Sequence, residues 1–155
     1  MNRREFVACV GGVLSFVAIR PALAARPTLL EAVNTFTGGV EVRAGRVAFD
    51  IPPLVENGNS VGVMIDVESP VTAEDHVKRI AIINEKNPQA DMIVFLLSPQ
   101  SGRAHVSTRL RLADSQTLMA VAEMSDGTYW SAAADVIVTL AACVEGVSEG
   151  GGGVP

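Results

Sequence analysis

The sequence is poor in aromatic residues and in cysteine, and it has no excess of positive charge. Phe, Trp and Tyr make up 5% of its 155 residues, there are two cysteines, and the net charge is −5. The acidic balance argues against nucleic-acid binding, which needs a basic surface, and against electrostatic attraction to an anionic membrane. The 48% hydrophobic content, mostly small and branched aliphatic residues, indicates one folded domain with an aliphatic core.

No apolar run is long enough to span a membrane, but the first 24 residues have the pattern of an export signal. Arg3 and Arg4 precede Phe6, a modest apolar run covers residues 7–17, and a small-x-small cleavage site ends at Ala24. A membrane anchor is the alternative, yet the run is too short for about 30 Å of hydrocarbon. The paired arginines predict a twin-arginine signal over residues 1–24, cleaved after Ala24, and export to the periplasm.

Cleavage at this site changes both the charge and the cysteine count of the chain. It leaves 9 of the 12 basic and 16 of the 17 acidic residues, so the mature charge is about −7. It also removes Cys9, which leaves Cys143 as the one cysteine and forbids an intramolecular disulfide. An odd cysteine in an oxidising compartment indicates an intermolecular bond or a reactive thiol.

The periodicity of the hydrophobic residues predicts one helix followed by strands. Apolar residues at helical spacing favour a helix over residues 28–36, with Thr28 as the N-cap and Gly38 as the stop. Beyond Val40 the apolar residues alternate with polar ones, and turn signals recur every 8–12 residues. The predicted strands cover residues 40–42, 47–51, 61–67, 77–83, 92–97, 104–112, 116–124, 129–130 and 136–140.

This pattern predicts an all-β fold. We expect an antiparallel, immunoglobulin-like β-sandwich over residues 25–142, with a short N-terminal helix and a flexible C-terminal arm. A doubly wound α/β fold is the weaker alternative, because no helical segments of 10–15 residues separate the strands. There is no internal repeat, and low complexity is confined to Gly150–Gly153.

Recognisable catalytic or metal-binding motifs are missing. His76, His105 and Cys143 lack the spacing of a metal-ligand set, and no G-x-S-x-G motif is present. Gly150–Gly153 has neither the lysine nor the following helix of a phosphate loop. We therefore expect no cofactor and no metal, and an autonomous hydrolase or oxidoreductase is disfavoured.

Polar residues on the predicted strands allow two weaker interpretations. Asp66 and Glu68 share one strand face and could divide acid and base roles, although exposed carboxylates are usually only solubilising. On the strand over residues 104–112, His105, Arg109 and Arg111 occupy the polar face. His105 is interpreted as a surface residue, and the two arginines form a small basic row that either contacts a partner or is solvated.

Cys143 is the most informative single residue. Free cysteines are usually buried and pack as small hydrophobes. Cys143, however, follows the last predicted strand and precedes a glycine-rich tail, which favours an exposed thiol, and no cation stands beside it. From the pattern alone, a functional thiol and a structural one both remain open.

Several segments taken in order resemble a known family. The stretch from Pro52 to Val61 has the sequence P-P-L-V-E-N-G-N-S-V, which fits the pattern P-x-x-x-E-N-G-N-x-V. Further matching segments follow at residues 69–70, 86–88, 98–104, 106–113 and 116–127. Together they span roughly residues 30–143 and resemble SoxY, the carrier subunit of sulfur oxidation.

The resemblance implies a covalent carrier that is not itself an enzyme. The family has an immunoglobulin-like fold, pairs with SoxZ in the periplasm, and holds sulfur intermediates on the cysteine of a C-terminal G-G-C-G-G swinging arm. A haem enzyme conjugates thiosulfate to that thiol, a dimanganese hydrolase releases sulfate, and a sulfane dehydrogenase oxidises what remains. In this chain Cys143 stands at the position of the carrier cysteine.

The arm departs from the family's pattern. Ala141-Ala142 and Val144-Glu145 replace the flanking glycines, and the chain continues to Pro155. An alternative alignment makes Gly150–Gly153 the remnant of the motif, but the distance from Asp126-Gly127 favours Cys143. We expect residues 143–155 to form a mobile tail. The alternative function is a non-carrying SoxY paralogue that acts as an interaction subunit.

Overall fold

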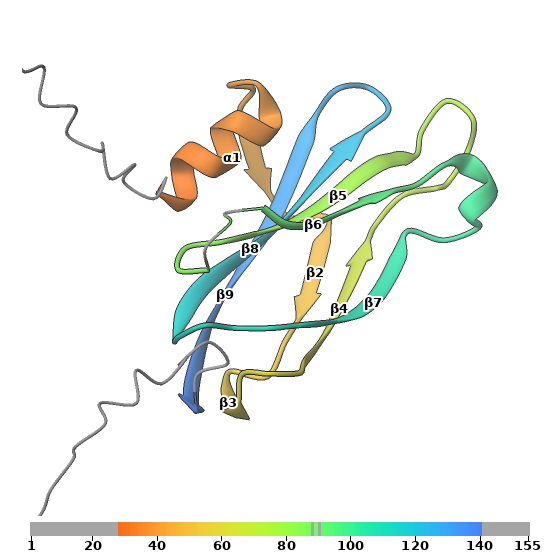
Figure 1. Cartoon of the computed structure of the whole chain (residues 1–155). Coiled ribbons are helices and arrows are strands. Elements are labelled where there is room, and N and C mark those ends of the chain that lie inside the picture. Colours follow the sequence, from red (N-terminus) through yellow and green to blue (C-terminus); the bar gives the residue numbers. More distant parts are fainter. Residues whose placement is uncertain (1–27, 88, 90, 141–155) are drawn as a thin grey trace, which may run out of the picture.

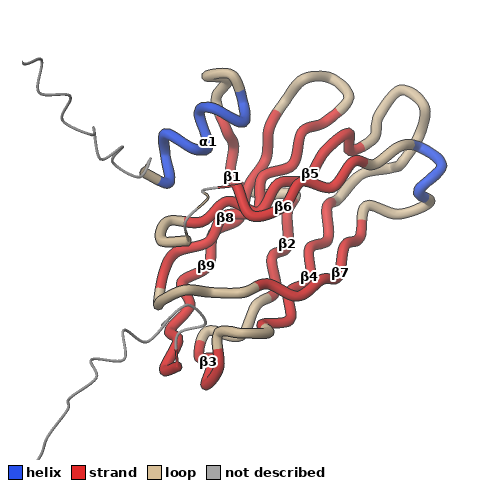
Figure 2. Tube along the Cα trace, viewed as in Figure 1, coloured by secondary structure: helices blue, strands red, loops and turns tan. Residues whose placement is uncertain are grey.

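The protein, as a computed structural model, is a sandwich of two β-sheets with one α-helix packed on the outside and a short 3-10 helix at Pro99–Ser101 (Figures 1 and 2). The structure describes residues 28–87, 89 and 91–140. The larger sheet contains, in spatial order, β1 (Val42–Ala44), β9 (Tyr129–Leu140), β8 (Gln116–Met124), β5 (Val77–Asn84) and β6 (Asp91–Leu96), with β3 (Leu54–Asn57) also paired to β9. The smaller sheet contains β2 (Val47–Asp50), β4 (Val61–Val67) and β7 (His105–Leu110). The predicted β-sandwich is confirmed.

The core lies between the two sheets because the strands alternate as the sequence predicts. On β4, Val63 and Ile65 are buried while Gly62 and Met64 face outward. Side chains from both sheets form one aliphatic cluster, and those of Ile65, Ile80, Ile82, Leu118 and Met124 are fully buried. Each such side chain contributes about 1.5–3 kcal/mol by leaving water, so an aliphatic core is sufficient without many aromatic residues.

Helix α1 (Leu29–Thr37) begins and ends where the sequence predicts. The Oγ1 of Thr28 accepts a hydrogen bond from the Glu31 N–H at 3.3 Å, and the Glu31 carboxylate accepts one from the Thr28 N–H at 2.7 Å. This reciprocal pair is a capping box. At the other end Gly38 adopts φ 66°, the left-handed conformation that stops a helix.

The helix covers part of the outer face of the larger sheet. Val33 packs in a second hydrophobic cluster with Ala81 and Val121 from the central strands. Phe36 meets Tyr129 edge-on, with ring centroids 6.2 Å apart. The amphipathic pattern seen in the sequence therefore places one side of α1 on the sheet and leaves the other in solvent.

We expect the substitution Thr28→Ala to lower the free energy of unfolding by about 1 kcal/mol, because it removes the side-chain acceptor of the capping box. The urea midpoint measures this loss. Thr35→Ala is the matched control, since Thr35 lies within the helix and its Oγ1 bonds only to the Glu31 carbonyl. Equal midpoints for the two variants would show that the cap does not stabilise the fold.

The first two predicted strands enter different sheets. β1 pairs in parallel with β9 of the larger sheet, whereas β2 pairs antiparallel with β4 of the smaller one. Gly45 and Arg46 between them both have positive φ, 112° and 55°, so the chain turns sharply there and crosses from one sheet to the other. Alternation alone predicts a strand but not its partner.

β3 was not predicted. Pro52-Pro53 marks the end of a strand in the sequence, and Glu56–Asn59 reads as a turn. In the structure the turn begins only at Asn57, whose Oδ1 accepts a hydrogen bond from Asn59 N at 2.9 Å. The residues before it pair in parallel with the end of β9, a partner about 80 positions later in the chain. β9 is likewise one strand of 12 residues, where two shorter strands were predicted.

Candidate functional site

Cys143, the predicted attachment site, lies outside the described residues, as do residues 1–27 and the tail from residue 141. The last described residue is Leu140, at the end of β9. The structure therefore defines the strand end that the cysteine-bearing segment follows in the chain. We call residues Val138–Leu140 the arm base.

The arm base is fixed from both sides. β3 pairs with it in parallel, with Val55 opposite Val138 and Asn57 opposite Leu140, and Thr139 Oγ1 donates a hydrogen bond to the Glu56 carbonyl at 3.0 Å. On the other side, Ser115 Oγ accepts a hydrogen bond from Val138 N at 2.8 Å. A segment that continues from this point starts from a well-anchored strand end.

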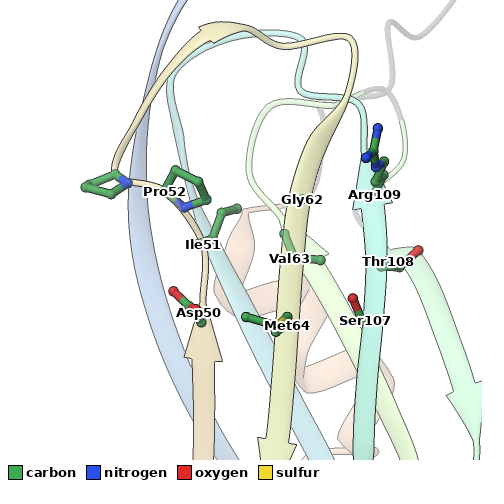
Figure 3. A pocket seen from close by; sticks show the side chains of 10 residues that line it. Asp50, Ile51, Pro52, Gly62, Val63, Met64, Ser107, Thr108 and Arg109 are labelled. Atoms are coloured by element: carbon green, nitrogen blue, oxygen red, sulfur yellow. The ribbon is translucent and has the colours of Figure 1, made fainter.

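A groove of about 610 Å³ lies on the smaller sheet (Figure 3). Its floor is Gly62 of β4, and a side chain added at this position would meet nothing within 4 Å. Glycine in a strand often marks a place where another group approaches closely. We call this feature the Gly62 groove; it is lined by Asp50, Ile51, Pro52, Pro53, Gly62, Val63, Met64, Ser107, Thr108 and Arg109.

Arg109 is the cation of the Gly62 groove. It stands opposite Gly62 in the β4–β7 pairing and is exposed, and its Nη1 donates a hydrogen bond to Ser60 Oγ at 3.3 Å. Within the described part of the chain, Arg79 and Arg103 are paired with carboxylates, whereas Arg109 contacts only this neutral hydroxyl. Its positive charge is thus available to an anion.

The other predicted polar residues form separate contacts. Asp66 Oδ1 lies 2.9 Å from both His105 Nδ1 and Arg103 Nη2. The hydrogen bond from His105, with further help from Arg103, lowers the pKa of Asp66. This carboxyl is ionised at neutral pH, which makes it a poor proton donor. Glu68 follows the end of β4 and joins none of these contacts, so the acid–base pair considered from the sequence is not assembled.

Neither histidine belongs to a metal-ligand cluster formed by the described residues. His76 lies in the loop before β5, with its Nδ1 3.1 Å from the Thr72 carbonyl, and His105 contacts Asp66. Over residues 28–87, 89 and 91–140, no three His, Cys, Asp or Glu side chains come close enough together to bind a metal ion. The described part of the chain also contains no helix that is long and apolar enough to cross a membrane.

Arg109 and Arg111 lie on the outer face, as the alternation predicts, but the groove beside Arg109 was not predicted. Its members come from three strands and from the connection 51–53 after β2, and their proximity depends on the β2–β4 and β4–β7 registers. The available signal was Gly62, a residue without a side chain at an outward position of a regular strand.

Comparison with known proteins identifies the family. A family model described as sulfur oxidation protein SoxY matches residues 33–143, well over half of the chain, and the match includes Cys143. The chain belongs to the SoxY family. Among solved structures, the sulfur carrier protein SoxY from Chlorobium limicola f thiosulfatophilum is similar, with a TM-score of 0.60 and 23% identity over 73% of this chain and 97% of that one.

Other structural neighbours of this SoxY-family chain share the sandwich alone. A superoxide reductase (neelaredoxin) from Ignicoccus hospitalis has a TM-score of 0.54 and 19% identity, over 61% of this chain and 80% of that one. At such identities the likeness establishes the fold and not the activity. No protein with a curated description matches significantly. The family and its fold support a sulfur-carrier role.

Proposed function

We propose that the chain carries sulfur intermediates covalently on Cys143 in the periplasm. The observation that carries this proposal is the SoxY family match, which extends to residue 143. The fixed arm base adds physical support, because Cys143 comes three residues after an anchored strand end. A short segment there can present its thiol to several partner enzymes while the sandwich keeps its structure.

The chemistry asks little of the carrier beyond a thiol. In conjugation, a sulfur–sulfur bond forms between the cysteine and the outer sulfur of thiosulfate, and one proton and two electrons leave, the electrons to a haem-containing partner. In hydrolysis by a dimanganese partner, water breaks the bond to the sulfonate, and sulfate and two protons leave a persulfide anion on the cysteine. A sulfane dehydrogenase then oxidises the remaining sulfur. A SoxZ-like subunit completes the proposed heterodimer.

A second candidate is a SoxY paralogue that binds partners but carries nothing. The observation that favours it is the arm itself, where Ala141-Ala142 and Val144-Glu145 stand in place of glycines. Side chains at these positions restrict the backbone and widen the arm, and both effects hinder entry into a narrow active site.

Intact-mass measurement separates the two candidates. The protein is purified from its own periplasm after growth on thiosulfate and measured with and without a reductant. A carrier has added sulfur mass that the reductant removes, whereas the non-carrying paralogue has the mass of the unmodified chain in both samples. An unmodified thiol throughout growth would contradict the carrier proposal, and the measured mass also reports whether residues 1–24 have been removed.

A further inference from the structure

We propose that Trp130, Arg43 and Arg46 form a docking site for an acidic surface of a partner protein. The site lies at the start of β9, at the opposite end of that strand from the arm base (Figure 1). It does not involve Cys143, so it is independent of the carrier chemistry. Its support comes from the geometry of the two arginines, from the charges around them and from their exposure.

Both guanidinium groups lie against the same tryptophan ring. The guanidinium carbon of Arg43 is 5.8 Å from the centroid of the Trp130 ring, and that of Arg46 is 5.3 Å from it. Arg43 reaches the ring because it stands opposite Trp130 in the β1–β9 pairing. The Thr128 hydroxyl accepts a hydrogen bond from Trp130 Nε1 at 3.3 Å and holds the ring in place. The ring thus positions two cations at one point of the surface.

Arg46 reaches the ring through an unusual backbone conformation. Its φ is 55°, and that of Gly45 before it is 112°. A positive φ is unfavourable for a residue with a side chain, and such outliers cluster at functional sites. Gly45 itself contacts the ring, since a Cβ there would lie 3.7 Å from Trp130 Cζ3, and the Arg46 carbonyl accepts a hydrogen bond from the Glu68 N–H at 2.7 Å. The turn from β1 to β2 therefore brings a second cation to Trp130 against its own backbone preference.

The two arginines repel each other, and no carboxylate of the described residues is in ion-pair contact with either. The cations of the described ion pairs are Lys78, Arg79, Lys86, Arg103 and His105. Glu41, two positions before Arg43, and Glu68, beside Arg46, are exposed. Like charges held together are destabilising unless an anion joins them. Guanidinium groups bind carboxylates with two parallel N–H donors, so the pair is suited to carboxylates of another molecule.

One further carboxylate, Asp126, interacts with these arginines through space. Its Oδ1 accepts hydrogen bonds from the Thr128 N–H at 2.8 Å and from the Thr128 hydroxyl at 2.7 Å. These bonds lower the pKa of Asp126, and the positive charges of Arg46 and Arg43 lower it further. Asp126 is therefore ionised and held by Thr128. Its single negative charge weakens the repulsion between the two cations but does not neutralise both.

The exposure of the site favours a protein surface as the anion. Arg43 is exposed, and Arg46 and Trp130 are half-buried. Tryptophan and arginine are enriched among the side chains that dominate protein–protein binding. Trp130 is ten residues before Leu140 on β9, a distance of about 33 Å. A partner bound at Trp130 therefore leaves the arm base free, and two proteins can bind the chain at once.

Arg109 and Arg111 form a second exposed basic pair that also attracts acidic proteins. Neither lies over an aromatic ring of the described residues, so neither is positioned as the arginines at Trp130 are. The two pairs are well separated. The end of β7 pairs at Val61 and the start of β2 pairs at Val67, six positions apart along β4, which is about 20 Å. The second pair is therefore an internal control for the first.

The first test uses Trp130, the one tryptophan of the chain, as a reporter. The full chain is titrated at low ionic strength with a capped hexaglutamate peptide while tryptophan fluorescence is recorded. We expect a saturable change. Arg43→Gln and Arg46→Gln should each weaken binding about five-fold, the effect of one charge pair about 4 Å apart in water. Arg46→Lys keeps the charge and most of the affinity.

The matched control is Arg111→Gln, which removes the same charge from the other basic pair and should leave the affinity at Trp130 unchanged. An equal fall in Arg111→Gln and Arg43→Gln would overturn the proposal, because net charge would then explain the binding. An equal response to capped hexaglutamine would overturn it as well. Saturation of the signal by free sulfate at the same concentration would do the same, since the site would then bind a small anion.

The second test looks for the partner in the protein's own cells. Glu41, which is exposed and two positions before Arg43, is replaced by the photo-cross-linking residue benzoylphenylalanine. We expect a cross-link to an acidic protein that forms equally in Cys143→Ser and is lost in Arg46→Gln. No cross-link, or one that persists in Arg46→Gln, would contradict the docking site. Because Cys143→Ser cannot carry sulfur, failure of the carrier proposal and failure of docking are distinguished.

Discussion

Cys143→Ser is expected to abolish every reductant-sensitive sulfur adduct on the protein, whereas Cys9→Ser leaves the adducts at the wild-type level. The nucleophile in conjugation is a thiolate, and a serine hydroxyl cannot replace it because it does not ionise near neutral pH and forms no stable bond to sulfur. Intact mass after exposure to thiosulfate and the partner enzymes measures the loss, from the full adduct to none.

The two cysteine variants are matched because each removes one thiol. Cys9 lies in the predicted signal, so after cleavage the Cys9→Ser protein is identical to wild type. Cys143 comes three residues after Leu140, where β9 ends, and serine differs from cysteine only in having oxygen in place of sulfur. We therefore expect the two variants to have equal melting temperatures. Adducts that persist in Cys143→Ser would place the attachment elsewhere and contradict the assignment.

The sequence predicts the strands of this protein better than it predicts their partners. The period-two pattern at Val61–Val67 needs only one buried and one solvated face, and it is confirmed residue by residue. Leu54–Asn57 is too short for a period, and its stability comes from pairing with the end of β9. Residues 131–135 include three alanines, which have low strand propensity, but the β8 ladder holds them in a strand.

The same limit applies to the functional site. The alternation predicts Arg109 as an outward-facing cation, but its lack of a carboxylate partner among the described residues depends on which side chains the β4 and β7 registers bring near it. The anchoring of the arm base depends further on β3, the strand that the sequence does not reveal. Cys143 was assigned through the family resemblance, and its surroundings lie outside the described residues. Local pattern identifies chemistry-bearing residues, and long-range pairing decides which of them meet.

Glu123→Gln is expected to destabilise the protein by about 2 kcal/mol at pH 7, a typical contribution of hydrogen bonds to a buried charged group. Glu123 of β8 is only 6% exposed, and it accepts hydrogen bonds from Lys78 Nζ, at 2.7 Å, and from Arg79 Nε. Arg79 also lies over the ring of Phe36, with 4.7 Å between the guanidinium carbon and the ring centroid. Glu123 thus orients the cation that contacts helix α1.

The destabilisation should also depend on pH in a definite direction. Burial raises the pKa of Glu123, but the hydrogen bonds and charges of Lys78 and Arg79 outweigh it, so the pKa is lowered overall. A carboxyl whose pKa is lowered by folding stabilises the folded state at every pH above its ordinary, unfolded-state pKa. This contribution is lost as the pH falls through the lower pKa of the folded state. We therefore expect the difference in unfolding free energy between wild type and Glu123→Gln to narrow below about pH 4.5.

Chemical denaturation at a series of pH values measures this difference. Asp66 and Asp126 also have lowered pKa values, so they too make the stability depend on pH. Their contribution is the same in wild type and in Glu123→Gln, and the difference between the two proteins therefore reports Glu123 alone. Glu68→Gln is the matched control, since Glu68 is exposed and should change the stability by less than about 0.5 kcal/mol at any pH. If the difference in unfolding free energy between wild type and Glu123→Gln stayed constant across the acid range, Glu123 would act through packing. A contribution from the ionised carboxylate has to disappear when that carboxylate is protonated, and this loss is what makes the sheet beneath α1 sensitive to acid.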